Sequence, residues 1–113
     1  MPKIVLAEDD ATMLTLLTTL LQLEGFEVVV ADISDVPSVV TKESPDHLLT
    51  DVHLAGKSGM EIVKTIRKNP ANKKVNIVMT SGLNMKDECL NCGANYFLLK
   101  PFMPDDLIKL LKN

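Results

Sequence analysis

Residues 47–51 read His-Leu-Leu-Thr-Asp, a short apolar run that ends in a carboxylate. The run lies between a Ser44-Pro45 break and a loop with two glycines, Gly56-Lys57-Ser58-Gly59. An apolar run of this length between breakers predicts a buried central strand. Burying a carboxylate without partners costs a large amount of free energy, so Asp51 at the end of this strand requires positively charged or hydrogen-bonding neighbours.

Four further apolar runs predict strands of the same sheet, and they cover Lys3–Ala7, Phe26–Ala31, Asn76–Thr80 and Tyr96–Leu99. Three of these runs are followed at once by polar side chains, which are Glu8-Asp9, Ser81 and Lys100. Nearly continuous apolar strands are typical of parallel sheets that are covered on both faces. If the strands run parallel, their polar ends meet at one edge, where open α/β sheets bind ligands.

Helical patterns alternate with these strands. Asp10 is predicted to cap the first helix, Ser34 is predicted to cap the second, and Pro37 is tolerable in the first turn of that second helix. The predicted helices run from Ala11 to Gly25, over 35–43, from the 56–59 loop to Asn69, over 84–92 and over 104–112. Strands that alternate with helices in this way predict an α/β sandwich with a parallel sheet and right-handed crossovers.

Length and composition predict one domain over residues 1–113, with 46% hydrophobic and 24% charged residues. The net charge of −3 and the lack of a Lys/Arg cluster argue against direct binding of nucleic acid. No apolar run has the length of a membrane span, so a cytoplasmic location is the default expectation. Cys89 and Cys92 cannot form a disulfide framework, and their place at the end of a helix disfavours a redox role.

The predicted site brings three carboxylates together, from Glu8, Asp9 and Asp51. Like charges about 4 Å apart repel by a few kcal/mol, and a hard cation such as Mg²⁺ relieves that repulsion. Lys100 adds an ammonium group and Ser81 a hydroxyl donor, so the site can hold the oxygens of a phosphoryl group in transfer. Asp51 is then the candidate nucleophile, and an aspartyl phosphate is the product.

These residues, in this order and spacing, resemble the receiver domain of bacterial two-component response regulators, as found in chemotaxis regulators. The resemblance rests on Glu8-Asp9, Asp51, Ser81-Gly82 and Lys100-Pro101-Phe102, and it covers essentially the whole chain. It implies a flavodoxin-like three-layer α/β/α sandwich whose five-stranded parallel sheet has the order 2-1-3-4-5.

The resemblance also implies the role of each residue at the metal site. Asp51 matches the phosphoacceptor, and Asp9 matches the direct ligand of Mg²⁺ or Mn²⁺. Glu8 matches a residue that acts on the water shell of the metal. His53 falls where a backbone carbonyl coordinates the metal. A sensor histidine kinase or a phosphotransfer protein is the implied phosphoryl donor.

A second group of residues matches the switch of the family. Ser81 matches the hydroxyl that moves toward the phosphoryl group, Lys100 matches the partner of its oxygens, and Phe97 matches the aromatic switch residue. The Lys100-Pro101 bond is expected to be cis. The implied output surface consists of the fourth helix, the fifth strand and the fifth helix, and a homodimer through the last helix is possible.

The chain departs from the family pattern in three places. Fewer residues separate Ser81 from Lys100 than is usual, by nearly one helical turn, so the fourth helix is expected to be short. Ala55 stands where the family usually carries proline. Leu83 and His53 occupy positions that influence how fast the phosphoryl group is lost, and we expect Leu83 to hinder the attacking water and prolong the phosphorylated state.

Two other functional classes are open at this point. A pseudo-receiver would share the fold and bind proteins without being phosphorylated, but Asp51, Ser81, Lys100 and the acidic pair argue against it. A flavin-binding relative would need a phosphate-binding loop after the first strand, where Glu8-Asp9-Asp10 would repel a phosphate. The side chains of His47 and His53 are expected to be structural or exposed rather than metal ligands, because no other ligands suit the spacing of a zinc site. The sequence leaves open whether the domain stands alone or belongs to a longer protein.

Overall fold

The computed structural model describes residues 1–112 and contains a five-stranded parallel sheet with helices on both faces. Its strands are β1 (Lys3–Ala7), β2 (Glu27–Val30), β3 (His47–Asp51), β6 (Asn76–Ser81) and β7 (Tyr96–Leu99). Their order is β2-β1-β3-β6-β7, which is the predicted order once the strands of a separate small hairpin are left out of the count. The helices are α1 (Ala11–Leu23), α2 (Val36–Glu43), α3 (Gly59–Lys68), α4 (Lys86–Cys92) and α5 (Pro104–Lys112).

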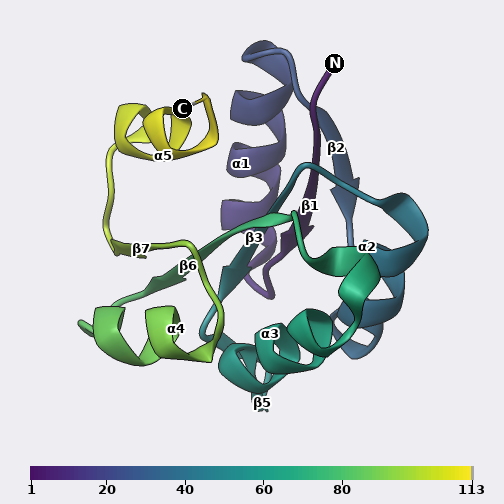
Figure 1. The fold of residues 1–113 in the computed structure, drawn as a ribbon. Helices are drawn as coiled ribbons and strands as arrows, with labels where there is room; N and C mark the ends of the chain where they lie inside the picture. The colour runs from purple at the N-terminus through teal and green to yellow at the C-terminus, as the bar shows by residue number, and fades with distance from the viewer. Residues whose placement is uncertain (113) are drawn as a thin grey trace.

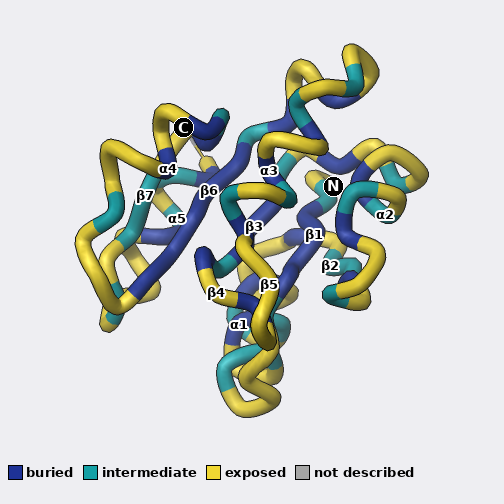
Figure 2. Tube along the Cα trace, turned by 90° about the horizontal axis from the view of Figure 1, so that it is seen from below, coloured by how far each residue is buried: buried dark blue, intermediate teal, exposed yellow. Residues whose placement is uncertain are grey.

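The helices form two outer layers, with α1 and α5 on one face of the sheet and α2, α3 and α4 on the other (Figure 1). Alternate strand residues divide between two cores: Val5 and Ile77 pack toward α2, α3 and α4, whereas Ile4 and Val78 pack toward α1 and α5. The three central strands are buried almost throughout, as Figure 2 shows in dark blue. This is the predicted three-layer sandwich, and it leaves the ends of the central strands as the place for polar groups.

Several local predictions are also confirmed. The Asp10 carboxylate caps α1 by accepting a hydrogen bond from the Met13 N–H at 3.0 Å. The Lys100-Pro101 bond is cis. Helix α4 has seven residues, so it is as short as expected. Among the helices of the described chain, none has the length and apolar character needed to cross a membrane.

One local prediction is wrong, and one element was not predicted. Ser34 does not cap α2, because a 3₁₀ turn over Ile33–Asp35 precedes that helix, and the Asp32 carboxylate accepts hydrogen bonds from Ser34 instead. The loop after Asp51 contains an antiparallel hairpin that the sequence analysis missed, formed by β4 (His53–Leu54) and β5 (Lys57–Ser58).

Candidate functional site

The site is built at the carboxyl edge of the sheet, where β1, β3, β6 and β7 end. Strand register brings Ala7 opposite Thr50, Asp51 opposite Thr80 and Ser81 opposite Leu99. The residues that follow these strands therefore come together although they are far apart in the sequence, as a parallel sheet requires.

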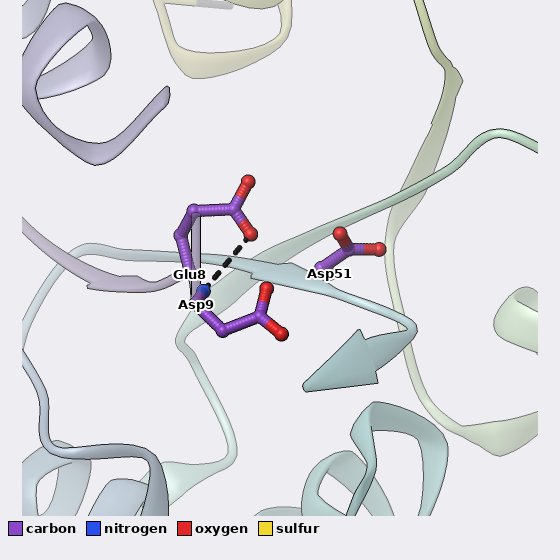
Figure 3. A group of neighbouring side chains, drawn as sticks. All are labelled: Glu8, Asp9 and Asp51. Atoms are coloured by element: carbon purple, nitrogen blue, oxygen red, sulfur yellow. Dashed lines mark hydrogen bonds between the residues drawn. The ribbon is translucent and has the colours of Figure 1, made fainter. Parts of the chain in front are cut away.

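Glu8, Asp9 and Asp51 form an acidic cluster at this edge (Figure 3). One carboxylate oxygen from each residue lies within 4.8 Å of the others, which is a separation that a single cation can bridge. The Glu8 side chain is only 6% exposed and the Asp51 side chain 14%, whereas Asp9 is exposed. Hard oxygen ligands with one open side suit Mg²⁺, which keeps part of its water shell.

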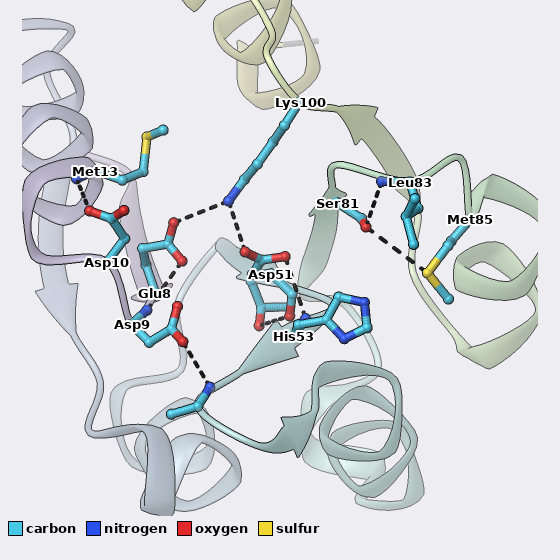
Figure 4. Close-up of polar contacts among 12 residues, drawn as sticks. Glu8, Asp9, Asp10, Met13, Asp51, His53, Ser81, Leu83, Met85 and Lys100 are labelled. Atoms are coloured by element: carbon cyan, nitrogen blue, oxygen red, sulfur yellow. Dashed lines mark hydrogen bonds and ion pairs between the residues drawn. The ribbon is translucent and has the colours of Figure 1, made fainter.

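Lys100 supplies the positive charge of the site. Its Nζ donates to Asp51 Oδ2 at 2.8 Å and to Glu8 Oε1 at 3.2 Å, so it bridges the two least exposed carboxylates (Figure 4). Burial raises the pKa of Glu8, and Lys100 opposes that rise. Burial lowers the pKa of Lys100, but its bonds to Asp51 and Glu8 outweigh burial and raise that pKa overall. Three carboxylates against one ammonium leave an excess of negative charge, as a divalent cation site needs.

Asp9 is oriented by the loop after β3. Its Oδ2 accepts a hydrogen bond from the Ala55 backbone N–H at 2.8 Å. Because Asp10 caps α1, Asp9 does not serve as the cap of that helix. Asp10 therefore stabilises the start of α1, whereas Asp9 belongs to the acidic cluster.

Gly59 packs directly behind the strand that carries Asp51. A Cβ at this position would lie 2.1 Å from the Asp51 carbonyl oxygen and 3.0 Å from that of Val52. The Gly59 N–H also donates to the Val52 carbonyl at 2.6 Å. The start of α3 therefore supports the backbone of Asp51 at a distance that only glycine permits.

Ser81 and Phe97 lie on the side of the site nearest α4. The Ser81 hydroxyl accepts from the Leu83 N–H at 3.1 Å and lies 4.0 Å from the Met85 sulfur, so it is turned toward α4 (Figure 4). Phe97 is partly buried and packs against the core beneath α2, α3 and α4. His53 is exposed, and its backbone N–H lies 3.4 Å from Asp51 Oδ1.

The remaining candidates lie away from this edge. His47 begins β3 at the opposite end of the sheet, beside Asn76 and the ring of Phe26. Cys89 and Cys92 are buried free thiols, and burial raises the pKa of Cys89 to about 11. A thiol with so high a pKa is almost entirely protonated at neutral pH, and the protonated form is a poor nucleophile.

The sequence marked Ala55 only as a departure from the family pattern, without its contact with Asp9, and it gave no role to Gly59. Ala55 contacts Asp9 through its backbone N–H, and the identity of the side chain at this position gives no sign of that contact. Gly59 could have been suspected, because glycine directly before a helical pattern often marks close backbone approach, but the sequence does not show what it approaches.

Comparison with protein families identifies the chain. The model of the response regulator receiver domain matches residues 4–112. The phosphate regulon transcriptional regulatory protein PhoB of Rhizobium meliloti strain 1021 is 32% identical over 116 residues, which cover 99% of this chain and 51% of that protein. The DNA-binding response regulator MtrA of Mycobacterium leprae is 33% identical over 110 residues, which cover 94% of this chain and 48% of that protein. The chain spans about half the length of these curated relatives.

Solved structures agree with the match. The chemotaxis protein CheY4 of Vibrio cholerae aligns with a TM-score of 0.88 and 28% identity, over 99% of this chain and 97% of that chain. The receiver domain of a sensor histidine kinase from Pseudomonas aeruginosa PAO1, solved with a magnesium ion in its active-site cleft, aligns with a TM-score of 0.88 and 26% identity over 98% of this chain and 94% of that chain. The family model, the relatives and the fold all agree, and the chain belongs to the response regulator receiver domain family.

Proposed function

We propose that this domain accepts a phosphoryl group on Asp51 from the phosphohistidine of a sensor histidine kinase or a phosphotransfer protein, in a reaction that requires Mg²⁺. The observation that carries the proposal is the joint geometry of the site. Oxygens of Glu8, Asp9 and Asp51 lie within 4.8 Å of one another, and the Lys100 ammonium lies 2.8 Å from Asp51. The magnesium ion in the related Pseudomonas receiver supports the same cofactor here.

The transfer breaks the phosphorus–nitrogen bond of the donor and forms a phosphorus–oxygen bond to Asp51. When bound, Mg²⁺ would neutralise charge on the phosphoryl oxygens. Asp51 and Asp9 would hold the metal directly, with the His53 carbonyl as a third ligand, and Glu8 would act on its water shell. Lys100 already donates a hydrogen bond to Asp51, so its ammonium group would be close enough to bind an oxygen of a phosphoryl group added there. Hydrolysis by water then releases phosphate and restores the carboxylate.

The change of state is proposed to start at Ser81. Its hydroxyl is now turned toward Leu83 and Met85, and it would move to the phosphoryl group while Phe97 turns inward. Redistribution between two existing conformations is sufficient for such a switch. The proposed output surface lies on and around α4, β7 and α5, and it exposes five large apolar side chains: Leu83, Leu90, Tyr96, Leu99 and Met103.

We place the domain in the cytoplasm, since both of its cysteines are free thiols and a kinase partner would need access to it. We also propose that the output surface binds a partner and that the surface of α5 forms a homodimer. These exposed apolar side chains support a protein partner rather than nucleic acid at this surface.

Acetyl phosphate tests the proposal directly, because it can donate a phosphoryl group without a kinase. Intact-mass measurement after incubation with acetyl phosphate and Mg²⁺ should show the addition of one phosphoryl group. Asp51→Asn should abolish the addition, and chelation of Mg²⁺ should prevent it in the unchanged protein. Asp10→Asn is the matched control, because Asp10 caps α1 and its substitution should leave the modification intact.

The competing pseudo-receiver has a clear signature in the same experiment. A folded protein whose mass does not change with acetyl phosphate and Mg²⁺, or that is modified equally in Asp51→Asn, would contradict the proposal. A binding module without phosphorylation would then be the better interpretation.

A further inference from the structure

The loop after Asp51 contains a tight turn that a side chain rarely adopts. Strands β4 and β5 pair with Leu54 opposite Lys57, so only Ala55 and Gly56 connect them. Their φ angles are +46° and +85°, and a two-residue hairpin loop with both φ positive is a type I′ turn. Asn, Asp or Gly is usual at its first position, because a Cβ makes positive φ unfavourable. Ala55 therefore occupies a strained conformation.

The Ala55 backbone N–H points away from the hairpin and toward the acidic cluster. It donates to Asp9 Oδ2 at 2.8 Å, across 46 positions of sequence. The hydrogen bond that closes a turn of this kind joins the two flanking residues, so the turn itself has no need of the Ala55 N–H. The contact with Asp9 is thus additional to what the hairpin requires.

Asp9 depends on this contact more than its neighbours do. Glu8 and Asp51 both pair with Lys100, but within residues 1–112 no salt bridge involves Asp9. Asp9 is also exposed, so solvent would otherwise leave its carboxylate free to rotate. One hydrogen bond from the backbone holds one oxygen and leaves the other free to face the cluster.

We infer that the Ala55 N–H is a positioning group for the cation site, which fixes the Asp9 carboxylate before a divalent cation binds. The inference deepens the proposed function, since it concerns the same site. A ligand carboxylate that is already oriented loses less conformational freedom on binding, so the cation binds more tightly. Hydrogen-bond partners of metal ligands commonly change metal affinity by about 10-fold to 100-fold when they are removed.

Two substitutions at position 55 differ in whether they keep the N–H and the φ angle of the turn. Ala55→Pro removes the N–H and cannot adopt positive φ, whereas Ala55→Gly keeps the N–H and adopts this φ without strain. Isothermal titration with MgCl₂ should show about tenfold weaker binding in Ala55→Pro and an affinity near that of the unchanged protein in Ala55→Gly. Equal Mg²⁺ affinity in the unchanged protein and in both variants would overturn the inference.

A third change removes only the donor, in case proline disrupts the whole loop. Replacement of Ala55 by L-lactic acid converts its amide to an ester and keeps the methyl group and the chirality. This ester protein should lose Mg²⁺ affinity as Ala55→Pro does. Affinity equal to that of the unchanged protein would show that the N–H contributes nothing, and the inference would be wrong.

Hydrogen exchange tests the contact without any cation. The Ala55 amide proton should exchange slowly in the unchanged protein and several-fold faster in Asp9→Ala, while the amides of β5 keep their rates. An Ala55 rate that does not respond to Asp9→Ala would refute the contact. Both readouts are independent of acetyl phosphate, so a failure of Asp51 phosphorylation would be distinguishable from a failure of this inference.

Discussion

At the scale of single residues, the site depends on one ammonium group that balances two poorly exposed carboxylates. Lys100→Met would leave Glu8 and Asp51 unpaired and mutually repulsive, so the free energy of unfolding should fall by about 1–3 kcal/mol at neutral pH. Urea denaturation in a chelating buffer measures the change. The loss should shrink on acidification, since protonated carboxyls no longer repel.

Lys64→Met is the matched control for that prediction. Lys64 pairs with Glu61 on an exposed surface, where ion pairs contribute about 0–1 kcal/mol. If both variants lose the same stability, Lys100 has no special electrostatic role and the prediction is contradicted.

Gly59 allows an equally sharp prediction, because an added methyl group would meet backbone rather than a flexible side chain. Gly59→Ala should destabilise the fold by about 1–3 kcal/mol and slow phosphorylation, since the Asp51 backbone must move. Gly82→Ala is the control, because a Cβ there meets no heavy atom within 4 Å. Thermal unfolding of Gly59→Ala and Gly82→Ala measures the difference in stability. Equal losses in the two variants would contradict the prediction.

The prediction for Leu83 is about the lifetime of the phosphorylated state. Leu83 is 66% exposed, and its backbone N–H donates to the Ser81 hydroxyl at 3.1 Å. We expect Leu83→Ala to admit the attacking water and shorten the half-life of the aspartyl phosphate several-fold, as measured by the decay of the phosphorylated mass. An unchanged half-life would show that Leu83 does not hinder water.

At the scale of secondary structure, the strands and their polar ends could be predicted, and the turns could not. Apolar runs located β3 and its neighbours, and the rule that parallel strands end at one edge brought Asp51, Asp9 and Lys100 together. The hairpin after Asp51 was missed because Ala55 is not a residue that favours the first position of a type I′ turn, although Gly56 suits the second. The pattern predicts Ser34 as a cap, but Asp32 caps the 3₁₀ turn that precedes α2, and the sequence shows no sign of that turn.

The start of β3 should make the fold sensitive to mild acid. His47 contacts the Phe26 ring and Asn76, and burial lowers its pKa while Asp46 opposes the shift. Because the unfolded chain then binds a proton more readily than the folded chain, stability should fall as pH decreases below about 6.5. His47→Gln should remove this part of the pH dependence.

Urea unfolding at several pH values between 7.5 and 5 measures that effect. The unchanged protein should lose stability more steeply than His47→Gln over this range. Parallel curves for the two proteins would mean that His47 binds protons equally in both states.

At the scale of the whole molecule, the cation site exists only when the sheet is formed. Glu8 and Asp9 follow β1, Asp51 ends β3 and Lys100 follows β7, so the unfolded chain has no comparable site. A ligand that binds only the folded state stabilises it by mass action, by about 2.7 kcal/mol at a concentration of one hundred times its Kd. MgCl₂ should therefore raise the melting temperature in a concentration-dependent way, which differential scanning calorimetry can follow.

Two adjacent residues, Asp9 and Asp10, provide the test variant and the control variant for this prediction. Asp9→Asn should abolish most of the rise, whereas Asp10→Asn should retain it, because Asn also caps helices and Asp10 lies outside the acidic cluster. The unbound Asp9→Asn protein should be no less stable than the unchanged protein, since one of three repelling carboxylates is removed. A rise of equal size in the unchanged protein and Asp9→Asn would locate the cation elsewhere and separate the acidic cluster from the metal chemistry proposed for it.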